Sequence, residues 1–342
     1  MGKTIFILAL LSNFSIVFSQ NTDGVHFKTD NKIIYDICFT DKGGAIGIAD
    51  NNTIKTYSTI SELLLNEFKN GHTGQILTID ISKDSTLLVS GGKDSTIVIW
   101  DFISGKILNS LTYQKGIITS VKISPNQKYL ASGGTDNKVF LYDLRKNEVT
   151  YEFTDHIDII TSVAFSPDGK LIVSSSADKM INIYDVETRK LISHLEGHRN
   201  WVRDISFNAN GLKLASCGDD AKVIFWDVSD INNIQKQRTK RIGFEWIISI
   251  DFSHGNDTYV TGGVNGKALI FTKYSRHTAK MGVHVNRVLF KPNEGDRLKI
   301  ALATRGKGVV MLEADKIKFQ PFSEIRSEKR NIVVGKMPSR DY

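Results

Sequence analysis

The feature that most constrains the fold is a segment of 42 residues that repeats along the middle of the chain. Each copy ends in an aromatic residue followed by aspartate: Trp100-Asp101, Tyr142-Asp143, Tyr184-Asp185 and Trp226-Asp227. Between these endings, apolar and polar residues alternate with period two, which is typical of half-buried β-strands. A fixed period of about 40 residues with this alternation indicates a β-propeller, in which each repeat supplies one four-stranded blade.

The start of each repeat can be followed along the chain, because three copies open on a histidine at the same distance from the next apolar strand. The opening positions are Asp30, His72, Gln114, His156, His198, Gly243 and Met281. They predict an all-β fold, a seven-bladed β-propeller of four-stranded antiparallel blades. The first, sixth and seventh copies lack the Trp-Asp ending, as end repeats often do. Their third strands are predicted at Thr53–Ser58, Lys267–Thr272 and Val309–Glu313.

Closure of the ring requires a strand from near one end of the chain to join the last blade. Val25–Thr29 precedes the first opening position, where no earlier blade exists, and Ile317–Gln320 competes for the same place. We expect Val25–Thr29 to close the ring, because closure leaves no open sheet edge that could aggregate. The other segment then lies outside the ring or against its rim.

Over roughly residues 24–320 the chain resembles the WD-repeat β-propeller family in repeat spacing, opening histidine and aromatic-Asp ending. The resemblance implies a hydrogen-bonded network inside each blade, formed by the opening His, a Ser or Thr, an Asp and the ending Trp. The matching sets are His72, Ser90, Asp94 and Trp100; His198, Ser216, Asp220 and Trp226; His156, Ser174 and Asp178 with Tyr184; and Gln114, Ser132, Asp136 and Tyr142. The sixth copy keeps only Thr261, Asn265 and Phe271. The first and seventh have essentially lost the network, so we expect them to be the softest blades.

The recurring Ser, His and Asp residues do not predict hydrolase chemistry. The same trio occurs in three separate repeats, whereas a nucleophile needs one site with one oxyanion hole. The sequence contains no GxSxG, phosphate-loop, HExxH or calcium-loop pattern. Cys38 and Cys217 fall in blades that are not neighbours, so we expect two buried, unpaired thiols. No Cys/His pair has metal-ligand spacing, and we therefore expect no metal, no cofactor and no enzymatic activity.

Residues 1–19 differ in kind from the repeats. Lys3 is followed by the mostly apolar stretch Ile5–Phe18 and by the small residue Ser19, which together are typical of a secretory signal peptide. The stretch is too short and too polar to span a membrane. We therefore predict a signal peptide at 1–19, the propeller at 20–321, a C-terminal tail at 322–342, and export to a periplasm or beyond the cell. A buried N-terminal helix is the alternative.

The formal net charge is +7, which raises the question of nucleic-acid binding. The basic residues are scattered, and the two modest runs are Lys236–Arg241 and Arg326–Arg330. A solvated face is the ordinary explanation of such runs. We expect no nucleic-acid partner.

Binding in a propeller concentrates on the loops at the mouth of its channel, and the residue three places after each opening position is expected to point there. These residues are Ile33, Gln75, Ile117, Ile159, Trp201, Trp246 and His284. The aromatic ones are adjacent, in blades five to seven. With their neighbours they define a candidate partner-binding surface, the aromatic rim: Ile157, Ile159, Arg199, Trp201, Arg203, Phe244, Glu245, Trp246 and His284. Trp, Phe and Ile edged by Arg are typical of protein-interaction hot spots; the alternative is that both tryptophans pack between blades.

Three functions follow, in decreasing order of support. The first is a secreted or periplasmic, non-enzymatic scaffold that binds a protein or peptide at the aromatic rim. The second is a glycan-binding propeller of the envelope, because stacked aromatics with Arg and Glu also suit sugar rings. The third is a propeller-based hydrolase or lyase, for which Glu245, Asp158 and His284 are the candidate acid and base groups. The propeller fold itself hosts many functions, so it does not choose among them.

Overall fold

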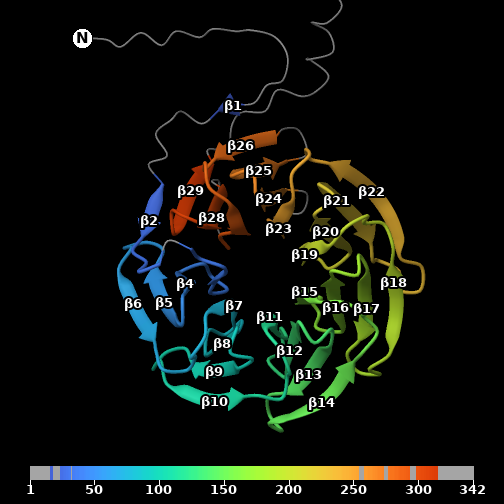
Figure 1. Ribbon diagram of the computed structural model, residues 1–342, viewed down its shortest axis with the longest axis horizontal. Helices are drawn as coiled ribbons and strands as arrows, with labels where there is room; N and C mark the ends of the chain where they lie inside the picture. The colour runs from blue at the N-terminus through green and yellow to red at the C-terminus, as the bar shows by residue number, and fades with distance from the viewer. Residues whose placement is uncertain are drawn as a thin grey trace, which may run out of the picture.

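The computed structural model describes residues 16–17, 24–31, 33–253, 258–272, 276–292 and 298–314, and it confirms the seven-bladed β-propeller (Figure 1). Each blade contains four antiparallel strands, and the innermost strand of each faces a common axis. Across these ranges, no helix has the length and apolar character needed to cross a lipid bilayer.

Blades 1 to 4 follow one another along the chain, each running from the axis outward. Blade 1 contains β3 (Ile37–Phe39), β4 (Ala45–Asp50), β5 (Thr53–Ser58) and β6 (Leu64–Phe68). Blade 2 contains β7 (Ile76–Ile81), β8 (Leu87–Gly92), β9 (Ile97–Asp101) and β10 (Ile107–Leu111). Blade 3 contains β11 (Ile118–Ile123), β12 (Tyr129–Gly134), β13 (Val139–Asp143) and β14 (Glu148–Phe153). Blade 4 contains β15 (Ile160–Phe165), β16 (Leu171–Ser176), β17 (Ile181–Asp185) and β18 (Leu191–Leu195).

Blades 5 and 6 continue this pattern, and blade 7 takes its outer strand from the other end of the chain. Blade 5 contains β19 (Val202–Phe207), β20 (Lys213–Gly218), β21 (Lys222–Asp227) and β22 (Gln235–Arg241). Blade 6 contains β23 (Ile247–Phe252), β24 (Tyr259–Gly263), β25 (Lys267–Phe271) and β26 (Arg276–Lys280). Blade 7 contains β27 (Val285–Phe290), β28 (Leu298–Thr304), β29 (Val309–Ala314) and β2 (Val25–Phe27).

The N-terminal strand closes the ring, as predicted. β2 pairs antiparallel with β29, with Val25 opposite Met311 and Phe27 opposite Val309. The competing segment Ile317–Gln320 lies outside the described residues. A further short strand, β1 (Ile16–Val17), runs parallel to β26 and extends blade 6. The boundaries at 1–19, 20–321 and 322–342 stay a prediction, because most of both terminal segments lies outside the described ranges.

The apolar core lies between neighbouring blades. Ile183 and Leu195 of blade 4, for example, pack with Val202 and Trp226 of blade 5. Alternation along each strand sends one set of side chains to the preceding blade and the other to the following blade, so both faces of each sheet are buried. Cys38 on β3 and Cys217 on β20 are buried and unpaired, as expected.

Glycine ends the second strand of several blades because the next blade approaches there. A Cβ atom at Gly91 would lie 2.4 Å from Cγ2 of Ile118, and one at Gly133 would lie 2.4 Å from Cγ2 of Ile160. Real Cβ atoms do not come so close to carbon, so these positions need glycine for inter-blade packing.

Candidate functional site

The networks implied by the WD-repeat resemblance are present in blades 2 and 5. In blade 5, His198 Nδ1 lies 3.0 Å from Asp220 Oδ1 and Nε2 lies 2.8 Å from Ser216 Oγ, while Trp226 Nε1 donates to the same Ser216 oxygen over 3.0 Å. Blade 2 repeats this arrangement. The Asp220 carboxylate also accepts the Arg199 backbone N–H, which fixes the loop that carries the rim.

Blade 3 forms the same network with different groups. Gln114 donates to Asp136 over 2.9 Å and accepts from Ser132 over 2.8 Å, so its amide makes both bonds that histidine makes elsewhere. The phenol near Ser132 is Tyr113, at 3.1 Å, whereas the Tyr142 hydroxyl bonds Asn109 and Asn147. The predicted role of Tyr142 is therefore wrong, because the Tyr113 ring, stacked on it, reaches the serine first.

Blade 1 has an ion-pair network where the sequence predicted none. Lys55 Nζ lies 2.5 Å from Asp30 Oδ2 and 3.1 Å from Asp50 Oδ2, and Asp50 accepts the backbone N–H groups of Asp30 and Asn31. Lys55 is buried, whereas Asp30 is largely exposed. Blade 1 therefore lacks the His–Ser–Asp–Trp network, as expected, and an ion-pair network that the sequence did not predict stands in its place.

The aromatic rim lies at one end of the ring, because each of its residues comes from or next to a loop between an outer strand and the innermost strand of the next blade. Arg203 of β19 lies at its centre, with Cζ 4.5 Å from the Trp201 ring centre and 5.7 Å from that of Trp246. Its Nε and Nη2 donate to the two carboxylate oxygens of Asp219 over 2.7 and 2.6 Å. A guanidinium held by a carboxylate and two rings is rigid before any partner arrives.

The two tryptophans differ in burial, which bears on whether they are open to a partner or pack between blades. Trp246 is 48 % exposed, and Phe244 beside it is 87 % exposed. Trp201 is half-buried against Arg203 and therefore serves as a support. Ile157 is 85 % exposed on the neighbouring loop. Arg199, Glu245 and His284 are also exposed, and Ile159 is half-buried. The cation–π contacts join Trp201, Arg203 and Trp246, while Phe244 contacts Arg241 instead.

A second apolar surface, absent from the sequence analysis, lies on the circumference of blades 1 and 2. Asn66 of β6 donates to the carbonyl oxygen of Ile103, so the outer edges of the two blades touch there. The large aliphatic side chains exposed along this edge are Ile60, Leu63, Leu64, Leu65, Ile103, Ile107 and Leu108. We call this surface the aliphatic edge.

The axis of the propeller is lined by polar side chains that join each blade to the next. They stand six places after each opening position: Asp36, Thr78, Ser120, Ser162, Asp204, Ser249 and Arg287. We call them the central polar ring. Thr78 Oγ1 accepts the N–H of Val121 in the next blade over 3.2 Å, and Ser120 does the same for Val163. Buried backbone groups need hydrogen-bond partners, and the central polar ring supplies them to N–H groups of the inner strands.

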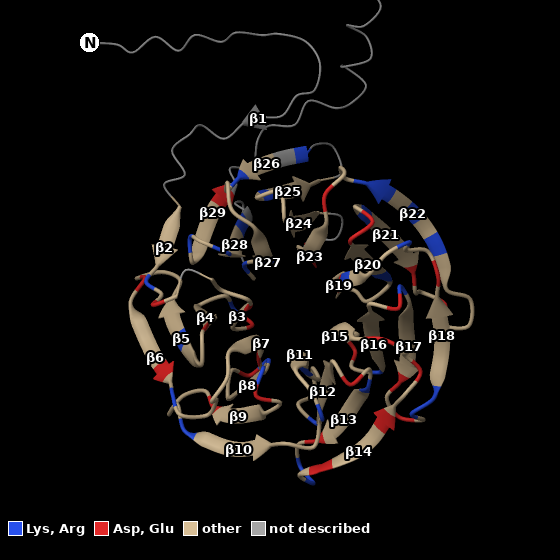
Figure 2. Ribbon diagram, viewed as in Figure 1, with Lys and Arg blue, Asp and Glu red and all other residues tan. Residues whose placement is uncertain are grey.

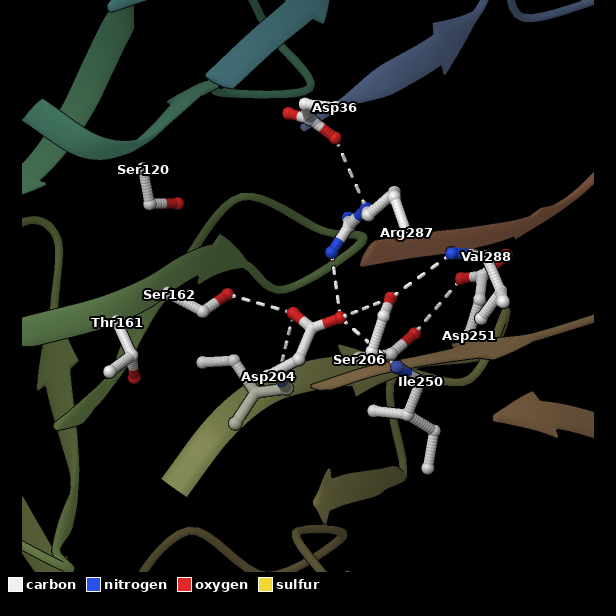
Figure 3. Close-up of polar contacts among 12 residues, drawn as sticks. Asp36, Ser120, Thr161, Ser162, Asp204, Ser206, Ile250, Asp251, Arg287 and Val288 are labelled. Atoms are coloured by element: carbon white, nitrogen blue, oxygen red, sulfur yellow. Dashed lines mark hydrogen bonds and ion pairs between the residues drawn. The ribbon is translucent and has the colours of Figure 1, made fainter. Parts of the chain in front are cut away.

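Arg287 completes the central polar ring by contacting two blades (Figure 3). Its Nη1 donates to Asp204 Oδ2 over 2.6 Å, and its Nε lies 3.3 Å from Asp36 Oδ1. The same Asp204 carboxylate accepts from Ser162, Ser249 and the Ile250 backbone. Burial acts to lower the pKa of Arg287, but the charges of Asp204, Asp36 and Asp251 outweigh it and raise that pKa. Arg287 therefore connects blades 1, 5 and 7 at the axis.

Asp251 of β23 gives the ring a pH-dependent component. Burial raises the pKa of Asp251 to about 6, against the hydrogen bond from the Phe290 N–H and the charge of Arg287. Between about pH 4 and 6 the folded chain keeps a proton that the unfolded chain loses, so this group makes the free energy of unfolding fall as the pH rises.

We expect Asp251→Asn to remove this fall in stability. The wild-type protein should lose about 1 kcal/mol more than the variant between pH 4.5 and 7, below the full linkage value of about 2 kcal/mol for this window, because the side chain is partly exposed. Denaturant unfolding at both pH values measures the difference, with Glu187→Gln on an exposed turn as control. Equal losses in the wild type and in Asp251→Asn would show that Asp251 does not titrate in this range.

Comparisons with known proteins match short segments of the chain to proteins of translation and the ribosome. It is 49 % identical to the small ribosomal subunit protein RACK1z of Arabidopsis thaliana over 41 residues, 12 % of each chain. It is 58 % identical to eukaryotic translation initiation factor 3 subunit I of Schizosaccharomyces pombe over 38 residues, 11 % of this chain and 12 % of the relative. The match to the same subunit of Phaeosphaeria nodorum is 40 % over 47 residues, 14 % of each chain. These matches span only about one blade of each relative.

The prediction of export to a periplasm or beyond the cell is wrong on these comparisons. The relatives are named for the ribosomal subunit and for translation initiation, and the family model that matches residues 60–232 is described as "Nucleolar protein 10-like, N-terminal domain". All three names refer to the interior of the cell. The comparisons therefore give no support to a signal peptide at residues 1–19.

The repeat spacing, the His–Ser–Asp networks and the seven four-stranded blades agree with these matches. The family model covers just over half of the chain, from the outer strand of blade 1 to the third strand of blade 5. The chain is a WD-repeat β-propeller and belongs to the nucleolar protein 10-like, N-terminal domain family.

Proposed function

We propose that this protein is a non-enzymatic interaction scaffold that binds a protein or peptide partner at the aromatic rim. The observation that carries the proposal is the contact of exposed Trp246 with an Arg203 side chain that is already held in place, next to exposed Phe244. Aromatic residues and arginine dominate the binding energy of protein interfaces. Because Asp219 and Trp201 fix Arg203, a partner loses little side-chain entropy when it binds there.

The shape of the rim favours a protein over a small molecule. The hollow next to Trp246, lined by Gly243, Glu245 and Asn265 among others, has a volume of about 20 Å³. Sites for small ligands usually need several hundred Å³. The exposed side chains of Trp246, Phe244 and Ile157 suit a partner that brings its own pockets or an extended segment. The relatives, named as subunits of a ribosome and of an initiation factor, also support a scaffold role.

The proposal predicts that Trp246→Ala weakens partner binding at least 30-fold, which corresponds to a lost hot spot of about 2 kcal/mol. The thermal midpoint should change by only a few degrees, because the ring is half exposed. Quantitative affinity capture with the full chain measures the first effect, and calorimetry measures the second.

A matched variant, Ile103→Ala, removes an exposed apolar side chain from the aliphatic edge instead. It should capture the partner as well as the wild-type protein does. Normal capture by Trp246→Ala together with loss of capture by Ile103→Ala would contradict the proposal and transfer the binding site to the aliphatic edge. A large fall in the thermal midpoint of Trp246→Ala would instead make that tryptophan a packing residue.

A further inference from the structure

Three aromatic rings pack together between blades 5 and 6, and we call them the aromatic floor. Tyr259 of β24 lies between Phe225 of β21 and Phe271 of β25, with ring centres 5.1 and 4.7 Å away. The Tyr259 and Phe271 rings are nearly parallel, at 16°. Stacked rings present a face with partial negative charge, which attracts cations.

Three cations meet over this floor. Lys240 of β22 places its Nζ 3.9 Å from the centre of the Phe271 ring and 5.9 Å from that of Tyr259. Arg238 stands two places earlier on the same strand, opposite Phe225, and therefore on the same side of the sheet. Arg276 comes from the adjacent outer strand β26, opposite Phe271. Figure 2 shows the basic segments of β22 and β26 next to each other. We call these three residues the cation cluster.

The charges of the cation cluster are not balanced by acidic side chains within the described ranges. Partial burial, together with the like charges of Arg238 and Arg276, lowers the pKa of Lys240 to about 8. Lys240 is half-buried and the two arginines are exposed. Other lysines withdrawn from solvent are paired: Lys55 contacts Asp30 and Asp50, and Lys122 contacts Asp80. Grouping three cations without a described carboxylate is electrostatically costly, and a bound anion would remove that cost.

We propose that Arg238, Lys240 and Arg276 bind a phosphate group carried by a phosphorylated residue of the protein partner. Guanidinium groups donate paired hydrogen bonds that match the oxygens of phosphate, and a lysine adds a point charge. Two negative charges on the phosphate offset most of the repulsion among the three cations. The aromatic floor excludes water from one side, which strengthens each contact.

The position of the cation cluster favours a protein as the carrier of the phosphate. β22 ends at Arg241, which contacts Phe244 of the aromatic rim, so one partner can reach both surfaces. A nucleic acid would need a longer basic track. The outer strands of the preceding blades do not provide one, because β18 contains no lysine or arginine and β14 contains Glu148 and Glu152. The proposal that a protein carries the phosphate group rests on the proposed function, whereas the phosphate site itself does not.

The test is a titration of the full chain with O-phosphoserine, with serine at matched ionic strength as the blank. The lysine side chains are observed by NMR, and Lys240→Met identifies the Lys240 signal. We expect phosphoserine, and not serine, to raise the apparent pKa of Lys240 by at least one unit. Arg238→Gln and Arg276→Gln should each weaken binding about tenfold, while Lys106→Gln, on an exposed turn of blade 2, should have no effect.

Further measurements distinguish a phosphoprotein from free phosphate and from nucleic acid as the ligand. No response of Lys240 to phosphoserine would overturn the phosphate site. Equal affinity for inorganic phosphate and for a phosphoserine peptide would overturn the claim that a protein carries the phosphate, and would leave a site for the free ion. A short single-stranded RNA that binds tenfold more tightly than the phosphopeptide, and depends on the same arginines, would replace the protein carrier with nucleic acid. Trp246→Ala should keep the phosphoserine response, so failure of the aromatic rim and failure of this site are distinguishable.

Discussion

Arg287→Met should lower the free energy of unfolding by about 3–5 kcal/mol, the largest effect expected of any single substitution in the central polar ring. The variant loses the cation that lies between Asp36 and Asp204 while both carboxylates remain buried. An uncompensated buried charge costs more than the ion pair itself contributes. Denaturant unfolding at pH 7 measures the loss.

Two further results distinguish this explanation from a simple loss of packing. Burial already raises the pKa of Asp36, and without Arg287 that pKa should rise further. The folded variant then binds protons that the unfolded chain does not, so its stability should recover as the pH falls from 7 to 5. Adding Asp204→Asn to Arg287→Met should also restore part of the stability. A loss that stays constant with pH and is unaffected by the second substitution would contradict the account.

His198→Ala should destabilise the protein by about 2–4 kcal/mol, because it leaves the buried Ser216 hydroxyl and the Asp220 carboxylate short of partners. Blade 3 supplies the control. There Gln114 makes both bonds, so His198→Gln should cost only about 1 kcal/mol. Thermal and denaturant unfolding of both variants measure the comparison.

The pH dependence of His198→Ala follows from Asp220. Burial acts to raise the pKa of Asp220, but the bonds from His198 and from the Arg199 N–H outweigh it and lower that pKa. Asp220 therefore stabilises the folded chain at pH values above the pKa that it has in the unfolded chain. This stabilisation is lost as the pH falls through its lower pKa in the folded chain. The difference in the free energy of unfolding between the wild-type protein and His198→Ala should become smaller in acid. Equal destabilisation by alanine and glutamine would mean that the network contributes through shape and not through hydrogen bonds.

The repeat made the fold predictable, because spacing and alternation set both the number of blades and their strands. Even the degenerate third strand at Thr53–Ser58 has the bounds of β5. The closing strand followed from topology, since only one segment preceded the first blade. The networks of blades 2 and 5 were also predictable from the resemblance, whereas the substitutes Tyr113 and Lys55 were not. Each of them comes from a different position in the repeat than the residue that it replaces. Only the packing of the side chains shows that it reaches the network.

The central polar ring has a signal in the sequence. A polar residue stands six places after every opening position, in or next to the inner strand of each blade. The pattern predicts inward-facing polar groups, but it cannot predict that Arg287 reaches Asp204 two blades away, because that contact depends on how the ring closes. The rim residues come from or next to loops at one end of the propeller, and the support of Arg203 by Asp219 needed the structure. The apolar residues 5–18 misled the prediction of location, since their composition alone does not define an export signal.

The most direct test of the aromatic rim is site-specific photo-crosslinking of the full chain inside the cells that make it. A photoreactive residue would replace Phe244 or Ile157 on the rim, Ile103 on the aliphatic edge, or Leu212 on a turn at the opposite end, all of them exposed. The account predicts one partner protein crosslinked from positions 244 and 157 and lost when Trp246→Ala is added. A partner crosslinked only from position 103 or 212, and indifferent to Trp246→Ala, would contradict it.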